Sequence, residues 1–373
     1  MMSDPAAGAQ TGRVTSWGKR ADVVVHTTEP FNAEAPPAAL GTPLTDVDAF
    51  YSRNHGPVPD LDPAAWTVRV EGLVDSPATL TLADLAQYDE VTLTATLQCA
   101  GNRRTELQAF RPVPGEVPWG PGATSTATWT GVLLSDVLAG VGIRDGARHV
   151  EFLAPDVATD SSPPQGFGGS VDLRTALTGE VLLATRMNGQ PLTRVHGAPV
   201  RVVVPGQIGA RSVKWVDRVV VRADPSPNWF QAHAYRLVPA DGDYGRDAER
   251  RGLALGPAAV TAAVLSPSPG ATVAAGSVPV SGYAFAGDGR GVIRVDVSGD
   301  GGTSWVQAEL SADLGRWAWR QWTARVDVAA GSGEIVARAW DASASTGPAR
   351  AADVWNPKGY VNSSWARVPV TVG

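Results

Sequence analysis

The chain has 373 residues, enough for two or three domains, and with 43% hydrophobic and 18% charged residues it has the composition of an ordinary soluble globular protein. Its net charge of −6 argues against nucleic acid as the main partner, and without an apolar run near the ~18 residues of a membrane span, or an export signal, we expect a cytoplasmic location. A single cysteine excludes disulfide frameworks, zinc or iron–sulfur sites built from several cysteines, and covalent haem attachment.

The first two thirds of the chain predict a mixed α+β domain that follows an N-terminal arm. Residues 1–44 are rich in alanine, proline and glycine without periodicity, which is typical of an arm on the surface or a partly disordered segment. In residues 45–255, strand-like alternation as at 66–74 is mixed with helical spacing as at 131–143, which ends at a glycine. Further strand-like runs cover 149–155, 180–189, 198–206 and 213–222.

The last third of the chain predicts a second domain made of strands. The composition shifts near residue 252, and the segment SPSPGATVAAGS at 266–277 is typical of a boundary or a first turn. Residues 256–373 contain about seven short alternating segments separated by turn residues, the signature of an immunoglobulin-like sandwich. The Cys…Trp…Cys pattern of antibody domains is absent, so an antibody-type domain is excluded.

The only cysteine, Cys99, stands in the segment TLQCAGNRR. A lone cysteine is more often a small buried hydrophobe than a working group. Here Arg103 and Arg104 would stabilise a thiolate, and Gly101 lets the backbone pass close to a bulky group. A thiolate is a nucleophile or a ligand for a soft metal, and because five histidines are available as bases, this segment alone leaves both uses open.

Four other segments accompany the cysteine segment. They are FYSRNHGPVP at 50–59, WGPGATSTATWTGVLL at 119–134, MNGQPLTRVHGAPVRVVVPGQIGARSVKWVDRVVV at 187–221 and the terminal VWNPKGYVNSSWARVPV. Together, and in this order from about residue 45 to 372, the five segments resemble the sulfite oxidase family of molybdenum enzymes. In that family the cysteine of the segment that corresponds to TLQCAGNRR binds molybdenum directly.

The resemblance implies a sulfite-oxidase-type mixed α/β molybdopterin-binding domain at 45–255 and an immunoglobulin-like dimerisation domain at 256–373, and therefore a homodimer. It implies a molybdenum–pyranopterin cofactor with Cys99 as the metal ligand, since thiolate sulfur suits a soft metal. The residues that hold the pterin and its phosphate are, by resemblance, Asn54, His55, His196, Arg201, Ser212 and Lys214. Gly206 and Gly209, followed by ARSVK, suit a phosphate cradle of backbone N–H groups.

A small anion pocket is implied by the same resemblance. Arg53 and Arg104 match the two arginines that face the family's active site, and guanidinium forks recognise oxyanions such as sulfite by paired hydrogen bonds. Trp119 matches the pocket tryptophan, and Tyr235 matches the tyrosine beside the metal oxo group.

Two positions depart from the family pattern. Ala234 replaces the aspartate that usually precedes the tyrosine, and Lys358 stands where sulfite oxidases usually carry a pocket arginine. Lysine keeps the charge but loses the bidentate fork, so it still favours an anion, with weaker binding.

The sequence therefore predicts molybdenum-dependent oxidation of sulfite to sulfate by oxo transfer. Because no haem segment is recognised, we expect the electrons to pass to oxygen or to an external carrier. Two alternatives stay open at this point: reduction of nitrate or an S-oxide on the same cofactor, and a cofactor-free binding protein that has kept the fold.

Overall fold

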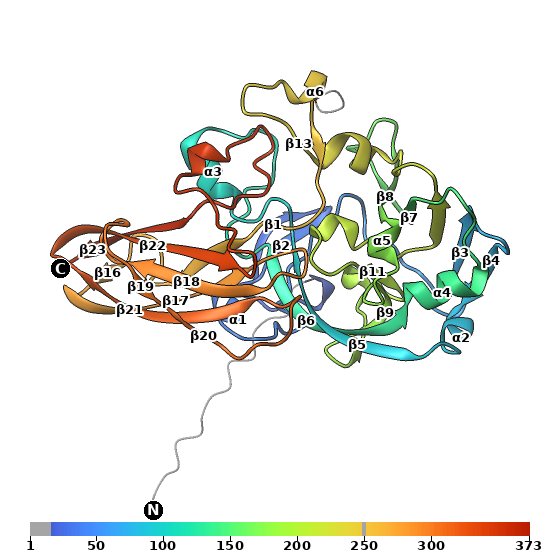
Figure 1. Ribbon diagram of the computed structural model, residues 1–373, viewed down its shortest axis with the longest axis horizontal. Coiled ribbons are helices and arrows are strands. Elements are labelled where there is room, and N and C mark those ends of the chain that lie inside the picture. Colours follow the sequence, from blue (N-terminus) through green and yellow to red (C-terminus); the bar gives the residue numbers. More distant parts are fainter. Residues whose placement is uncertain (1–15, 248–250) are drawn as a thin grey trace, which may run out of the picture.

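The computed structural model describes residues 16–247 and 251–373. The chain consists mostly of strands with few, short helices, which confirms the predicted α+β fold class. Figure 1 shows the strands β16 to β23 gathered on one side of the molecule and the sheets of the first half on the other, with β1 and β2 between them. Among the helices of these described ranges, none is long and apolar enough to cross a membrane.

Two five-stranded sheets form the scaffold of the first half. One has the order β10-β9-β6-β5 with β11 also paired to β9, and the other has the order β4-β3-β12-β7-β8. The strands are β3 Thr67–Gly72, β4 Ala78–Thr81, β5 Glu90–Gln98, β6 Thr124–Leu133, β7 His149–Ala158, β8 Gln165–Asp172, β9 Leu182–Met187, β10 Gln190–Pro191, β11 Arg201–Val203 and β12 Arg218–Arg222. The helices are α2 Leu82–Leu85, α3 Arg104–Phe110, α4 Leu134–Val141, α5 Leu173–Ala176 and α6 Tyr244–Asp247, with short η1 Ser16–Gly18, η2 Arg194–His196, η3 Gly209–Arg211 and η4 Phe230–Ala234.

Both sheets and helix α4 share one hydrophobic core. Alternate residues of the strands, such as Val68 and Val70 of β3, point into it together with one side of α4. The segment 131–143 is helical only from Leu134, because its first residues continue β6 and pair with β9. The helix ends as predicted at Gly142, whose φ of +69° is a conformation that glycine adopts without strain.

Residues 16–44 do not form the predicted surface arm. Strands β1 (Val24–Thr28) and β2 (Phe31–Glu34) pair antiparallel, α1 (Pro37–Leu40) follows, and every residue of β2 is buried. Glu34 accepts hydrogen bonds from the backbone N–H groups of Gly120 at 2.5 Å and Gly122 at 2.9 Å. The prediction was wrong for this part because contacts with distant segments, rather than local periodicity, bury it; residues 1–15 lie outside the described residues.

The second half is an immunoglobulin-like sandwich, as the sequence predicts. Its sheets have the orders β15-β17-β21-β20 and β16-β23-β22-β18-β19, and the apolar faces of the two sheets pack into one core. The strands are β15 Thr261–Ser266, β16 Thr272–Val273, β17 Gly276–Phe285, β18 Val292–Ser298, β19 Val306–Gln307, β20 Glu309–Leu310, β21 Arg320–Val328, β22 Gly331–Asp341 and β23 Ala366–Val372. Strand β15 belongs to the sandwich and comes before the segment 266–277, so this segment is a turn within the sandwich. The domain boundary at 255/256 stays a prediction.

The loop that follows Cys99 links the two halves. The fully buried Arg103 donates hydrogen bonds to Thr261 Oγ1 at 2.8 Å and to the carbonyl oxygen of Ser364 at 2.9 Å. Asn102 donates to the hydroxyl of Tyr283 at 2.9 Å, and this hydroxyl donates in turn to the Pro121 carbonyl. The sandwich therefore fixes the loop that positions the cysteine.

Candidate active site

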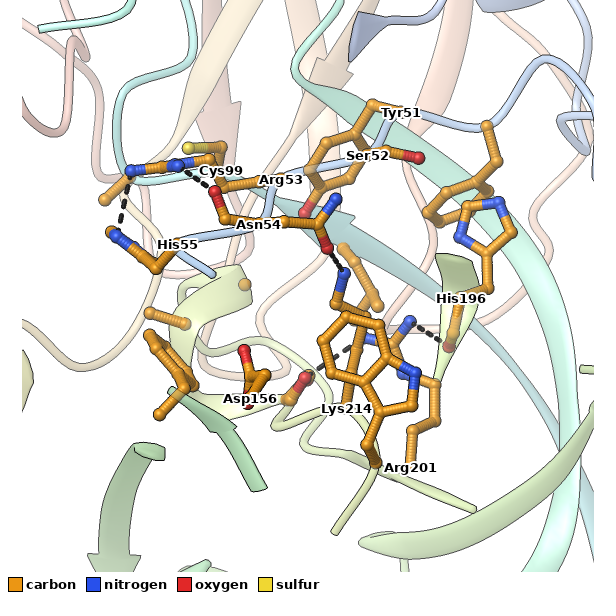
Figure 2. Close-up of a pocket in the computed structure, with 18 of the residues that line it drawn as sticks. Tyr51, Ser52, Arg53, Asn54, His55, Cys99, Asp156, His196, Arg201 and Lys214 are labelled. Atoms are coloured by element: carbon orange, nitrogen blue, oxygen red, sulfur yellow. Dashed lines mark hydrogen bonds between the residues drawn. The ribbon is translucent and has the colours of Figure 1, made fainter. Parts of the chain in front are cut away.

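A cavity lies in the first half of the molecule, where segments distant in sequence converge (Figure 2). It is walled by residues 50–55, by the end of β5 and the cysteine after it, and by the stretch from η2 to the residues after η3. The predicted site residues that line it are Arg53, Asn54, His55, Cys99, His196, Arg201, Ser212, Lys214 and Tyr235. The structure thus brings most of the predicted site residues together in one cavity.

Cys99 lies directly after strand β5 with a buried side chain at the cavity wall. Its backbone N–H donates to the carbonyl oxygen of Ala123 at 2.9 Å, and its Sγ accepts from the Gly101 N–H at 3.4 Å. Burial raises the pKa of the thiol, while Arg104 and Arg53 favour the thiolate. Arg103 does not stabilise the thiolate as the sequence suggested, because its guanidinium pairs with Glu106.

His55 and Tyr235 meet at one side of the cavity. Nε2 of His55 lies 2.8 Å from the Tyr235 hydroxyl, and Nδ1 lies 3.1 Å from both Arg53 Nη2 and Asp160 Oδ2. Phe167 stacks on the imidazole at 5.3 Å. Burial lowers the pKa of His55 to about 3, so the ring is neutral near pH 7, and it raises the pKa of Tyr235, which stays protonated.

The opposite wall of the cavity carries two cations, the buried Arg201 and the half-buried Lys214. Arg201 donates to the carbonyl oxygens of His196 at 3.1 Å and Ser212 at 3.0 Å, and Lys214 donates to Asn54 Oδ1 and to the Val195 carbonyl (Figure 2). Burial lowers the pKa of Arg201 to about 10, and it lowers the pKa of Lys214 well below its usual value. These partners are neutral oxygens, so an anion in the cavity would offset the cost of burying both charges.

Asp156, on β7, was not identified from the sequence. It lines the same cavity, is 5% exposed, and its Oδ1 accepts no hydrogen bond within the part of the chain that the structure describes. Burial raises the pKa of this carboxyl to about 7. Only the folded structure identifies Asp156 as a site residue, because nothing in its local sequence sets it apart from other strand residues.

The cavity fits the predicted cofactor. The donors Arg201 and Lys214 can bind the oxygens of a phosphate, and the Cys99 sulfur can bind a soft metal. Asp156 Oδ1, which has no hydrogen-bond partner among the described residues, can accept from an N–H group of a pterin ring. Of the two glycines of the predicted cradle, Gly209 lines the cavity, and a Cβ there would lie 2.6 Å from the Tyr51 hydroxyl. Gly206 does not line the cavity, and a Cβ there would lie 2.5 Å from the ring of Trp317 in the second half.

Arg104 and Lys358 lie beside the cavity and share a carboxylate that the sequence reading missed. Glu116 Oε1 accepts a hydrogen bond from Lys358 Nζ at 2.5 Å, and its Oε2 lies 3.5 Å from Arg104 Nη2. Arg104 also donates to the carbonyl oxygens of Lys358 and Val117, and its guanidinium lies over the ring of Tyr360 at 5.3 Å. Both predicted cations are thus held together by a carboxylate that an anion would have to displace.

Trp119 does not line the cavity, contrary to the predicted role as a pocket tryptophan. The side chain is fully buried, belongs to the hydrophobic cluster that also holds Trp129, and makes an edge contact with His26 at 4.9 Å. Ala234, the other noted departure, is buried within η4 and belongs to the cluster that contains Tyr235. Position 234 therefore carries no carboxylate beside Tyr235 in this chain.

Comparison with known proteins agrees with the geometry. The family described as oxidoreductase molybdopterin binding domain matches residues 55–230, and the Mo-co oxidoreductase dimerisation domain matches residues 256–373. The chain is 43% identical to the sulfite oxidase of Gallus gallus over 92% of this chain and 76% of that protein, and 40% identical to the sulfite oxidase of Arabidopsis thaliana over 94% of each. It resembles the crystal structure of the sulfane dehydrogenase SoxCD from Paracoccus pantotrophus with a TM-score of 0.79 and 25% identity, covering 92% of this chain and 85% of that one.

Proposed function

The chain belongs to the sulfite oxidase family of molybdopterin-dependent oxidoreductases, and from this premise we propose that it oxidises sulfite to sulfate. The observation that carries the proposal is a buried cysteine sulfur at the wall of a cavity whose other side chains are largely cationic or hydrogen-bond donors. This combination suits a metal with an anionic cofactor and an oxyanion substrate. The alternatives of a nitrate or S-oxide reductase use the same cavity, so substrate choice depends on the anion site.

The molybdenum–pterin cofactor supplies the two-electron redox chemistry, and the protein binds it and positions the substrate. Cys99 would hold the metal, and His196, Arg201, Ser212 and Lys214 would hold the pterin and its phosphate. Asp156 would accept a hydrogen bond from the pterin. The neutral His55 and the protonated Tyr235 keep their mutual hydrogen bond at the cavity wall.

The substrate anion would meet Arg53 at the cavity wall and Arg104 and Lys358 beside it. Their positive charge favours sulfite over a neutral S-oxide, because a dianion gains more from three cations than a dipole does. Without a bound anion, Glu116 forms ion pairs with Arg104 and Lys358. Lysine in place of arginine at 358 gives a point charge without a fork, which predicts weaker anion binding than in relatives with arginine.

We further propose that the protein is a homodimer, supported by the dimerisation-domain match at residues 256–373. The two electrons of each turnover would leave for oxygen or an external carrier, since the single cysteine rules out covalent attachment of a c-type haem. The cytoplasmic location expected from the sequence stays a prediction.

The test is a side-by-side assay of sulfite, nitrate and an S-oxide with molybdenum-loaded protein. We expect sulfite turnover, with oxygen consumption and reduction of added cytochrome c measured in parallel to identify the acceptor. Cys99→Ser should lose turnover while still binding pterin, because a serine hydroxyl is a poor ligand for a soft metal. Nitrate reduction without sulfite oxidation, or full turnover by Cys99→Ser, would overturn the assignment.

A further inference from the structure

Lys19 is a buried lysine of the N-terminal segment that contacts His196, a residue of the cavity wall, and it lies ahead of the family-matched range that begins at residue 55. Its side chain is 1% exposed. Its Nζ donates to the carbonyl oxygens of Val47 at 2.9 Å and Phe50 at 2.7 Å, and lies 2.5 Å from Nε2 of His196. Lys19 does not line the cavity itself, whereas His196 does.

The contacts of Lys19 determine which ring nitrogen of His196 carries the proton. An ammonium group has three donors and no acceptor, and here it faces two carbonyl oxygens and one imidazole nitrogen. An imidazole nitrogen that accepts a hydrogen bond carries no proton, so the proton of a neutral His196 belongs on Nδ1. Of the two groups the amine is the stronger base, since the reference pKa of lysine lies about four units above that of histidine.

Burial lowers the pKa of both Lys19 and His196, and the pKa of Lys19 stays the higher of the two. It lowers the pKa of Lys19 to about 7, with Asp48 opposing this change, and lowers the pKa of His196 well below its usual value. The neighbouring cations Lys19, Arg201 and Lys214 add to the effect on His196. His196 is therefore neutral, and below about pH 7 the proton of the pair is held by Lys19.

The other edge of the imidazole faces the cofactor cavity. In Figure 2 the Nδ1 side of the His196 ring is directed toward Lys214 and the interior of the cavity, while Nε2 is on the far side. Phe50 packs edge-on against the ring at 5.4 Å and holds its plane. An Nδ1–H in this position is a hydrogen-bond donor for an acceptor atom in the cavity.

We propose that Lys19 is a positioning residue for the cofactor: its ammonium group holds His196 in the Nδ1–H tautomer, so that the imidazole donates a hydrogen bond to an oxygen or ring nitrogen of the bound pterin. The inference rests on the proposed function only for the identity of the bound group. The N-terminal segment is in this way part of the cofactor site, and it contributes through a residue that does not touch the cofactor.

The tautomer can be measured on the apoprotein by nitrogen-15 NMR of protein labelled at histidine, with His196→Gln used to assign the signal. We expect wild-type His196 to carry its proton on Nδ1. In Lys19→Met the Nε2 atom keeps the Val47 carbonyl at 3.2 Å, an acceptor, so the proton should move to Nε2. A wild-type His196 protonated on Nε2, or a folded Lys19→Met variant that keeps the Nδ1–H tautomer, would overturn the proposal.

Cofactor retention provides the second readout. Molybdenum and released pterin should fall about 10-fold in Lys19→Met, the lower end of the loss that follows removal of a residue which orients a metal-site histidine. The matched control is Arg20→Met, because Arg20 is the adjacent cation but its guanidinium pairs with the exposed Asp22. Circular dichroism shows whether both variants fold, and equal molybdenum content in the two folded variants would overturn the role of Lys19.

These readouts separate the inference from the proposed function. Neither the tautomer nor the cofactor content depends on which substrate the enzyme oxidises, so failure of the sulfite assay leaves both results interpretable. If Lys19→Met does not fold, the wild-type tautomer alone decides the proposal.

Discussion

Glu116 controls the anion site at the scale of single residues. Its carboxylate binds the same two cations, Arg104 and Lys358, that the substrate would use. We expect Glu116→Gln to lower KM for sulfite several-fold, corresponding to about 1 kcal/mol of competition removed, and to strengthen inhibition by sulfate with a smaller change in kcat.

Steady-state kinetics with sulfite and sulfate measure this effect. Glu90→Gln is a suitable control, because Glu90 is a half-exposed carboxylate paired with Arg186 away from the cavity. An unchanged KM in a well-folded Glu116→Gln enzyme would mean that the carboxylate does not compete with the substrate.

His55 couples folding to pH. Burial lowers its pKa to about 3 in the folded chain, against about 6.5 when unfolded, so between these values the unfolded state binds more protons. Stability from this group is complete above pH 6.5 and falls by about 1.4 kcal/mol for each pH unit below it, until pH 3. We expect apoprotein His55→Gln to lose this part of the acid destabilisation.

Urea unfolding of the apoprotein at pH 7, 6 and 5 tests this prediction. His233→Gln provides the control, since its imidazole stacks on Trp229 and does not line the cavity. The same slope of stability against pH in wild type and His55→Gln would rule out His55 as the titrating group.

At the scale of elements, the start of helix α3 depends on Arg103. This residue adopts a positive φ of 61° just before the helix, and its fully buried guanidinium pairs with Glu106 and bonds to Thr261 and Ser364 of the sandwich. Its removal leaves two buried acceptors, Thr261 Oγ1 and the Ser364 carbonyl oxygen, without their donor, and it leaves the partly exposed Glu106 without its ion pair. We expect Arg103→Met to destabilise the protein by about 2–4 kcal/mol and to reduce activity by displacing the cysteine loop.

Chemical denaturation and sulfite turnover together measure the effect of Arg103→Met. Arg174→Met is the control, because Arg174 is an exposed residue of α5 and should change stability by less than about 0.5 kcal/mol. Wild-type stability in Arg103→Met would contradict the role of this residue as the link between the two halves.

At the scale of the whole molecule, the second half both supports the cysteine loop and carries the dimerisation-domain match. We expect light scattering of the purified protein to give twice the mass of one chain. A single-chain mass at micromolar concentration would contradict the proposed homodimer, while the contacts of Arg103 within one chain would remain.

The sequence by itself determined the parts of the site that lie in continuous segments. Asn54 and His55, the cysteine loop, and the stretch from His196 to Lys214 each carry their chemistry in a short run of residues, and all of them line one cavity. The fold class followed for a similar reason, because alternation along strands such as β3 and the turn-rich second half record which residues are buried.

Only the tertiary structure decided what depends on contacts between distant segments. Asp156 lines the cavity and Lys19 contacts the cavity residue His196, both from segments with no local motif. Glu116 brings Arg104 together with the distant Lys358, and Trp119 packs into the core instead of the cavity. Burial by remote partners leaves no periodic pattern in the chain, so composition alone suggested a loose arm where β1 and β2 are packed.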